Sequence, residues 1–302
     1  MLDLAQRSRP QTTRNLLGID DLSTWELSAL LDMAAVMKRH PLAWRSALEG
    51  RAVACVFEGP STRSRVSLEV AVHRLGALPV VLQPDQLRLD EGDSIAETAY
   101  AFSSYCDAIA VRTHRHRDLL ELVEHASVPV INALTDREYP CRALADCLTL
   151  RDRFGDLHGL RLAYVGDSEA VAYSLIEAAM LTGIEVRIAA PPALLPDPAL
   201  LTRAGETVRV CETPREAVTG AAAVYAAAWR GEMPEAYRVT PELMSLAAPR
   251  GVFMHAIGTA HEREVHREVL DGPRSVIAEQ AANLLPVEQA VLRALVTGDW
   301  EA

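Results

Sequence analysis

Hydroxyl and guanidinium side chains fill five consecutive positions early in the chain, where an apolar stretch at 52–57 gives way to a helical pattern. Unpaired backbone N–H groups at the start of a helix attract anions, and arginine forks suit phosphate. A serine N-cap followed by two solvated arginines would produce the same pattern, so these residues alone leave an anion site and a plain helix cap equally open. The residues are Ser61, Thr62, Arg63, Ser64 and Arg65.

A second candidate, Arg112, lies near the end of a predicted strand at 106–113. Ligands of open parallel sheets bind at the carboxyl ends of the strands, so we expect Arg112 to face a ligand. The basic and histidine-rich run that follows, 114–117, is typical of a solvated loop.

Tyr139 stands before Pro140, which suits the first turn of a helix predicted at 141–155. Arg142 falls within that first turn, where a cation faces the positive end of the helix dipole. Its position therefore indicates an anionic partner. Either a ligand or a surface pair with Glu138 would supply one.

Two predicted strands in the second half of the chain end in polar residues. The strand at 160–167 ends at Asp167 and is followed by Glu169, and the absence of a G-x-G-x-x-G pattern there excludes NAD. Two acids at a strand end favour a cationic ammonium group as the guest. His255, in the strand at 251–258, suits a general acid/base or a packed histidine, and both interpretations stay open.

The composition limits the class of protein. The chain has 302 residues and a formal charge of −11, which argues against general nucleic-acid binding. It shows no apolar run long enough for a membrane span and no apolar signal at its start. The five cysteines lack metal-site spacing, so we expect them to be reduced and mostly buried, with no metal and a cytoplasmic location.

Short apolar segments alternate with amphipathic helical ones, which predicts the α/β class with two doubly wound domains, each around a central parallel sheet. We expect a first domain at 1–140 and a second at 141–285, hinged near the helix at 141–155. The last segments are predicted to be a short strand at 275–280 and a helix within 286–302 that packs back on the first domain.

These segments, in this order, resemble the aspartate/ornithine carbamoyltransferase family over residues 15–297. The family's carbamoyl-phosphate signature, S-T-R-T-R after a strand, appears as S-T-R-S-R at 61–65. The stretch "GDSIAETAYAFSSYCDAIAVRT" is similar to the family's next helix and strand, and "GLRLAYVGD" to the start of its second domain. The resemblance identifies the chain as a divergent member.

The resemblance implies that carbamoyl phosphate binds to the first domain and an amino acceptor to the second, without cofactor or metal. It implies trimers with active sites between subunits, in which Arg88 of the 83–93 loop reaches a neighbour's phosphate. The implied phosphate ligands are Ser61, Thr62, Arg63, Ser64 and Arg112, and the implied catalytic residues are Arg63, Arg112 and Tyr139.

Two family motifs of the carbamoyl site are altered. H-P-x-Q appears as Y-P-C-R at 139–142. A tyrosine hydroxyl can still polarise a carbonyl, but a guanidinium cannot accept a hydrogen bond from an amide NH₂. H-C-L-P appears as H-A-I-G at 255–258, which leaves the backbone carbonyls of Ala256 and Ile257 to accept from the carbamoyl group.

The acceptor motif D-x-x-x-S-M-G falls on 227–233 and has lost its defining residues. We therefore expect carbamoyl transfer to a small amino-acid-like acceptor other than ornithine, in specialised biosynthesis. Two alternatives stay open: a different phosphorylated or carboxylate-bearing substrate on the same fold, and a catalytically silent ligand-binding paralogue. The acceptor-binding candidates are Arg142, Asp167, Glu169, Arg230 and His255.

Overall fold

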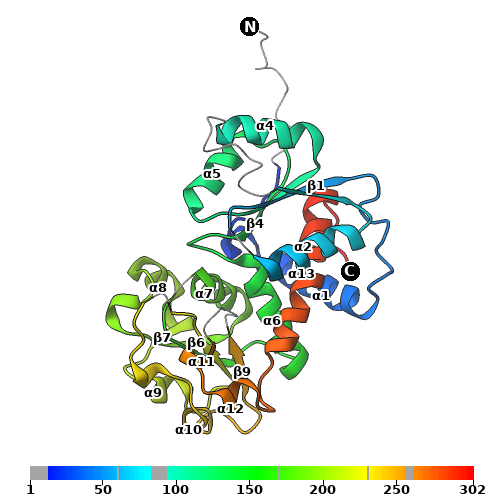
Figure 1. Ribbon diagram of the computed structural model, residues 1–302. Helices are drawn as coiled ribbons and strands as arrows, with labels where there is room; N and C mark the ends of the chain where they lie inside the picture. Colours follow the sequence, from blue (N-terminus) through cyan, green and yellow to red (C-terminus); the bar gives the residue numbers. More distant parts are fainter. Residues whose placement is uncertain (1–12, 60, 83–93, 169, 230, 256–260) are drawn as a thin grey trace.

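Two α/β units, one above the other in Figure 1, make up the computed structural model. Each contains one parallel sheet covered by helices, so the predicted fold class is confirmed. Among the described residues, no helix combines the length and the apolar character needed to cross a membrane. The structure describes residues 13–59, 61–82, 94–168, 170–229, 231–255 and 261–302.

The first sheet has four parallel strands in the order β2, β1, β3, β4. Its central strand β1 is entirely apolar and buries five of its six residues, as a strand covered on both faces requires. The register pairs Phe57 with Arg112, so β1 and β3 end side by side. The elements are β1 (Ala52–Phe57), α2 (Thr62–Arg74), β2 (Leu78–Leu82), α4 (Ile95–Tyr105), β3 (Ala108–Arg112), α5 (His116–His125) and β4 (Val130–Leu134).

The second sheet has five parallel strands in the order β7, β6, β5, β8, β9. Its strands are β5 (Arg161–Val165), β6 (Glu185–Ala189), β7 (Val208–Val210), β8 (Ala223–Ala226) and β9 (Val252–His255). Its helices are α7 (Ala170–Thr182), α8 (Pro198–Ala204), α9 (Pro214–Val218), α10 (Pro241–Met244), α11 (His261–Glu264) and α12 (Arg267–Leu270).

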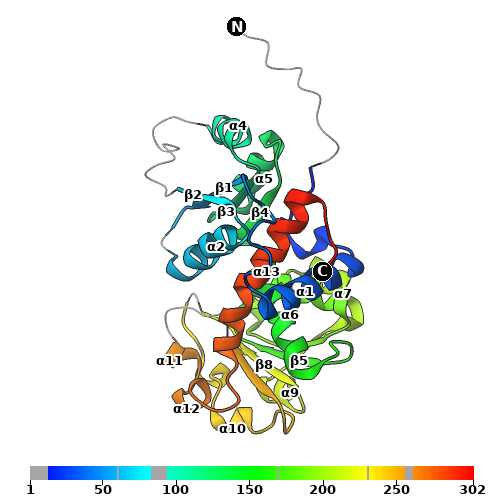
Figure 2. The same ribbon diagram turned by 90° about the vertical axis from the view of Figure 1, so that its right-hand side faces the viewer.

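Three long helices join the two units. α6 (Pro140–Phe154) follows the last strand of the first sheet and is buried from Pro140 to Leu150. α13 (Ile277–Thr297) packs against α6, α2 and α1 (Thr24–Arg39), and Figure 2 shows it running from the lower unit to the upper one. The C-terminal helix therefore packs on α2 of the first unit and also contacts β9 of the second sheet.

The expected strand at 275–280 is wrong. Only Ser275 forms a β-bridge, to Phe253, and α13 begins at Ile277, nine residues before the predicted start at Pro286. Pro286 lies inside this helix and is buried. The prediction started the helix at Pro286 because proline, which lacks an N–H, suits the first turn of a helix, but packing against three neighbouring helices keeps this proline inside a longer helix.

The remaining predicted strands and helices of the α/β alternation are present within a few residues of their expected bounds. Helix α1 was not predicted. Its start is marked by a capping box in which Ser23 and Glu26 hydrogen-bond each other's backbone N–H groups. All five cysteines are free and four are buried, as expected.

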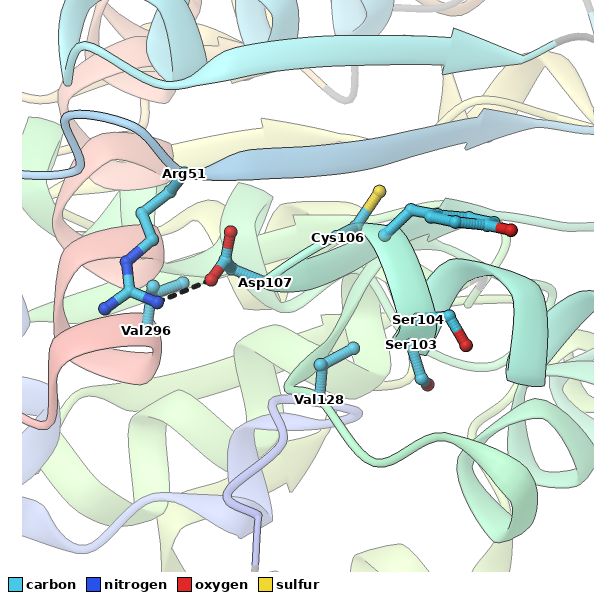
Figure 3. A pocket seen from close by; sticks show the side chains of 8 residues that line it. Arg51, Ser103, Ser104, Cys106, Asp107, Val128 and Val296 are labelled. Carbon is cyan, nitrogen blue, oxygen red and sulfur yellow. Dashed lines mark hydrogen bonds and ion pairs between the residues drawn. The ribbon is translucent and has the colours of Figure 1, made fainter. Parts of the chain in front are cut away.

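A hollow of about 350 Å³ opens at the amino ends of β1 and β3. Figure 3 shows Arg51 reaching across it to Asp107, to which it is ion-paired at 2.6 Å. Ligands of parallel sheets bind at the opposite, carboxyl edge, where Arg112 lies. This hollow is therefore not the site that the sequence predicts.

Glu288 of α13 is a buried acid that faces α2, where the Ser67 hydroxyl donates to its Oε2 at 2.5 Å. Burial raises the pKa of Glu288 to about 8 from an ordinary 4.5, and the bond from Ser67 offsets only part of this effect. Because the pKa of Glu288 is about 4.5 in the unfolded chain and about 8 in the folded protein, its contribution to stability is complete below about pH 4.5. This contribution is lost as the pH rises through about 8, where the buried acid must ionise.

We expect Glu288→Gln to raise the melting temperature relative to wild type by several degrees at about pH 9, and by less at about pH 6. The amide keeps the shape of the acid but cannot ionise. Thermal unfolding at both pH values measures the difference, with the exposed Glu49→Gln as the control. An offset that is the same at both pH values would contradict the buried, protonated state of Glu288.

Candidate active site

The carboxyl ends of β1 and β3 bring the first group of predicted residues together. Arg112, the last residue of β3, donates from one terminal nitrogen to Ser61 Oγ at 2.7 Å and to Ser64 Oγ at 3.2 Å. Ser61 occupies the N-cap position of α2, yet its side chain makes no capping hydrogen bond. The hydroxyl instead faces the arginine, which is the geometry of a polar site and not of a plain helix cap.

The first turn of α2 adds to this cluster. It contains no acidic residue, and Thr62 and Arg63 are exposed there. Arg65, in the same turn, pairs with Glu69 one turn further along the helix, at 2.6 Å. The start of α2 thus presents positive charge and backbone N–H groups beside Arg112.

Tyr139 joins the same cluster from a different element. Its hydroxyl lies 3.1 Å from Ser64 Oγ, so Ser64 links Tyr139 to Arg112. Burial raises the pKa of Tyr139, so its hydroxyl keeps its proton at neutral pH. The residue precedes α6, and its backbone N–H donates to Ser174 Oγ of α7 at 2.8 Å.

Glu58 fixes the strand ends behind this cluster, a role that the sequence did not reveal. Its carboxylate accepts from the Thr113 hydroxyl and from the His114 N–H, and its own N–H donates to the Arg112 carbonyl at 2.9 Å. Burial acts to raise the pKa of Glu58, but these hydrogen bonds hold it below its usual value. The sequence did contain a signal for this role, because Glu58 is an acidic residue directly after the buried strand β1.

Arg142 lies inside the protein, where it joins α6 to β9. Its Nε pairs with Asp146 at 3.0 Å, and a terminal nitrogen donates to the His255 carbonyl at 2.7 Å. Asp146 also accepts from Tyr225 at 2.8 Å and from Gln280 at 2.7 Å. The anionic partner that the sequence indicated is therefore Asp146, and the alternative of a surface pair with Glu138 is wrong, because Arg142 is only 4 % exposed.

Asp167 and His255 lie at the carboxyl edge of the second sheet. Asp167 follows the end of β5 by two residues, His255 is the last residue of β9, and β8 lies between these two strands. Both are buried. The His255 ring nitrogen Nε2 is 3.9 Å from Glu264 Oε2, and its backbone N–H donates to Gln280 at 3.1 Å. The Asp167 carbonyl accepts from the hydroxyl of Tyr164 at 3.2 Å.

Several predicted site residues lie outside the described part of the chain, and the structure says nothing of them. Within the described residues, no group of three or more His, Cys, Asp or Glu side chains is arranged to hold a metal ion. The undescribed candidates are Arg88, Glu169, Arg230, Ala256 and Ile257.

Comparison with protein families assigns both halves of the chain. Residues 14–152 match the model of the aspartate/ornithine carbamoyltransferase carbamoyl-P binding domain, and residues 158–295 match the model of the Asp/Orn binding domain.

Individual relatives cover nearly the whole chain. A protein of Symbiobacterium thermophilum named ornithine carbamoyltransferase is 40 % identical over an alignment of 299 positions that covers 92 % of this chain and 96 % of the relative. The crystal structure of ornithine carbamoyltransferase from Thermus thermophilus matches with a TM-score of 0.89 and 39 % identity, covering 95 % of this chain and 100 % of that one. The enzyme from Pyrococcus furiosus gives a TM-score of 0.90 at 35 % identity, covering 95 % and 97 %.

These relatives correct one expectation. An acceptor other than ornithine was predicted from a few altered motif positions, yet proteins about 40 % identical over more than nine-tenths of the chain are named ornithine carbamoyltransferase. The prediction gave a few altered side chains in the acceptor motif more weight than the similarity of the rest of the chain to these relatives. The resemblance itself is confirmed, and the chain belongs to the aspartate/ornithine carbamoyltransferase family, as an enzyme of the carbamoyltransferase type.

Proposed function

We propose that this enzyme transfers the carbamoyl group of carbamoyl phosphate to the side-chain amine of ornithine. The observation that carries the proposal is the hydrogen-bonded chain from Ser61 through Arg112 and Ser64 to Tyr139. It places a permanent positive charge, two serine hydroxyls and a neutral phenol around one point at the start of α2. The names of the relatives support ornithine as the acceptor.

The phosphate group is proposed to bind at the start of α2. The amine nitrogen attacks the carbonyl carbon, the bond from that carbon to the bridging oxygen breaks, and the phosphate leaves with that electron pair. The proton that the amine loses is taken up by the phosphate. Negative charge builds on the phosphate as it leaves, and fixed donors aimed at it lower the barrier. The proposed ligands are Ser61, Thr62, Arg63, Ser64 and Arg112.

Tyr139 is proposed to donate its hydroxyl proton in a hydrogen bond to the carbonyl oxygen, which gains charge during the attack. Its contact with Ser64 supports this role because it orients the phenol beside the phosphate ligands. Arg142 is proposed to contribute indirectly. It holds the carbonyl of His255, from which the segment with the proposed carbamoyl acceptors Ala256 and Ile257 begins.

The acceptor is proposed to bind at the edge of the second sheet where Asp167 and His255 lie. The Asp167 side chain suits the ammonium group of an amino acid. Glu169 and Arg230 stay predictions as further ligands, as does the division into a phosphate domain at 1–140 and an acceptor domain at 141–285.

We also propose a homotrimer with active sites between subunits. The edge strand β2 leaves Leu78 63 % exposed, and Val66 of α2, the helix that contacts β2, is 54 % exposed, which supports an apolar interface on this side of the first sheet. Arg88 stays the proposed ligand from the neighbouring subunit. The five free thiols support a location in the reducing cytoplasm.

We expect the purified protein to release phosphate from carbamoyl phosphate when ornithine is present, together with an equal amount of carbamoylated ornithine. Mass spectrometry of the product and a phosphate assay measure both. Aspartate, lysine and a diamine serve as control acceptors. Transfer to one of these controls but not to ornithine would overturn the proposed acceptor.

Arg112→Gln is expected to lower kcat/KM at least about 100-fold, since charge-assisted hydrogen bonds to phosphate are worth about 3 kcal/mol. The loss should appear in KM for carbamoyl phosphate and in kcat, with KM for ornithine little affected. Arg117→Gln, on the exposed face of α5, is the matched control. Equal effects of the two substitutions would contradict the phosphate role of Arg112.

Tyr139→Phe is expected to lower kcat about 10- to 100-fold while leaving KM for both substrates within about threefold, because it removes a donor used mainly in the transition state. Tyr139→His, which restores a donor, should recover part of kcat. The exposed Tyr105→Phe is the control. Full activity of Tyr139→Phe would show that the phenol does not act on the carbonyl.

A further inference from the structure

The backbone of Tyr139 is anchored by the opposite unit. Its N–H donates to the hydroxyl of Ser174, which lies on α7 beside the second sheet. The same hydroxyl donates to the carboxyl group of Glu138, the residue before Tyr139. Ser174 is completely buried, so both bonds are shielded from water. One serine of the second unit thus holds two consecutive residues of the first.

The first unit holds the same turn from the other side. The Glu138 carbonyl accepts from the N–H of Thr135 at 3.0 Å and from the side-chain amide of Asn132 at 3.2 Å. The turn at Glu138 is therefore fixed to β4 through its backbone and to α7 through its side chain. A shift of α7 must strain one of these attachments.

Glu138 lies among charged groups from several elements. The facing acids are Glu177 of α7 and Asp20 near the start of the chain, and the cations are Arg137 and Arg203. Arg203 of α8 pairs with one oxygen of Glu177, and the other oxygen, Oε2, is buried without a hydrogen-bond partner among the described residues. Burial, with the nearby Glu177, raises the pKa of Glu138 to about 8.

We propose that Ser174 and Glu138 are positioning residues that couple α7 to the hydroxyl of Tyr139. The inference rests on the role proposed above for Tyr139 in the transfer reaction. α7 begins directly after the edge where Asp167 lies and the acceptor is proposed to bind. Acceptor binding that shifts α7 therefore moves the turn that carries Tyr139.

The hydrogen bond from Ser174 lowers the pKa of Glu138 and offsets part of the effect of burial, since a carboxylate accepts such a bond more strongly than the neutral acid does. The attachment therefore rests on the two hydrogen bonds of the Ser174 hydroxyl group, one to each of two consecutive residues.

Ser174→Ala tests the attachment itself. We expect the amide hydrogen of Tyr139 to exchange at least about tenfold faster, and kcat to fall about tenfold with KM for carbamoyl phosphate nearly unchanged. Thr182→Ala is the matched control, since Thr182 lies on the same helix and its hydroxyl donates to the carbonyl of Ala178, within that helix. Unchanged exchange at Tyr139 in Ser174→Ala would overturn the proposal.

Glu138→Leu tests the second attachment and serves if Ser174→Ala does not fold. It removes the acceptor that orients the Ser174 hydroxyl. We expect exchange at Tyr139 to become several-fold faster and kcat to fall several-fold, whereas Glu138→Gln, whose amide oxygen can still accept from Ser174, should stay close to wild type. Wild-type exchange and kcat in Glu138→Leu would overturn the proposal.

Hydrogen exchange is measured on the protein without substrates, so it reports on this coupling separately from the reaction. Absence of transfer to ornithine would overturn the proposed function, while faster exchange in Ser174→Ala would still support the anchoring of Tyr139. Normal transfer with unchanged exchange would overturn the coupling alone.

Discussion

The guanidinium group of Arg112 ties together the elements on which the site depends. It ends β3, lies beside the end of β1 in the sheet register, and donates to both serines at the start of α2. Through Ser64 it also reaches the phenol of Tyr139 ahead of α6. A half-buried guanidinium group needs hydrogen-bond acceptors, and Arg112 finds them in two neutral serine hydroxyls. Because these acceptors carry no charge, a bound phosphate can pair with the positive charge of Arg112 without displacing a carboxylate.

Polar groups buried between the two units give the fold a second constraint. Arg142 and Asp146 of α6 bind His255 of β9, Tyr225 of β8 and Gln280 of α13. Such a network orients the elements it joins, because breaking any one bond leaves a buried polar group unpaired. In the family motif the position of Arg142 carries a glutamine next to the carbamoyl group. Here an arginine anchors β9, and the Tyr139 hydroxyl lies beside Ser64, one of the proposed phosphate ligands.

Much of this could be predicted from local signals. The strands at 52–57 and 106–113 are apolar runs, and a strand followed by hydroxyls and arginines predicted the polar start of α2. Contacts between distant residues could not be predicted. The pairing of Arg142 with Asp146 could have been guessed from its i,i+4 spacing, but its bond to His255 crosses 113 positions. Pro286 concealed the first nine residues of α13, which are held in the helix by packing against three others. Ser174, a polar residue in the largely apolar first half of α7, was a signal that the sequence offered and the prediction overlooked.

The central claim is that the Ser61, Ser64 and Arg112 cluster holds the phosphate of carbamoyl phosphate. Isothermal titration calorimetry of the wild-type protein and Arg112→Gln with carbamoyl phosphate tests it most directly. The account predicts one site per chain in the wild type and at least about 100-fold weaker binding in the variant. Equal affinity in the two proteins, or no binding to the wild type at millimolar concentration, would contradict it.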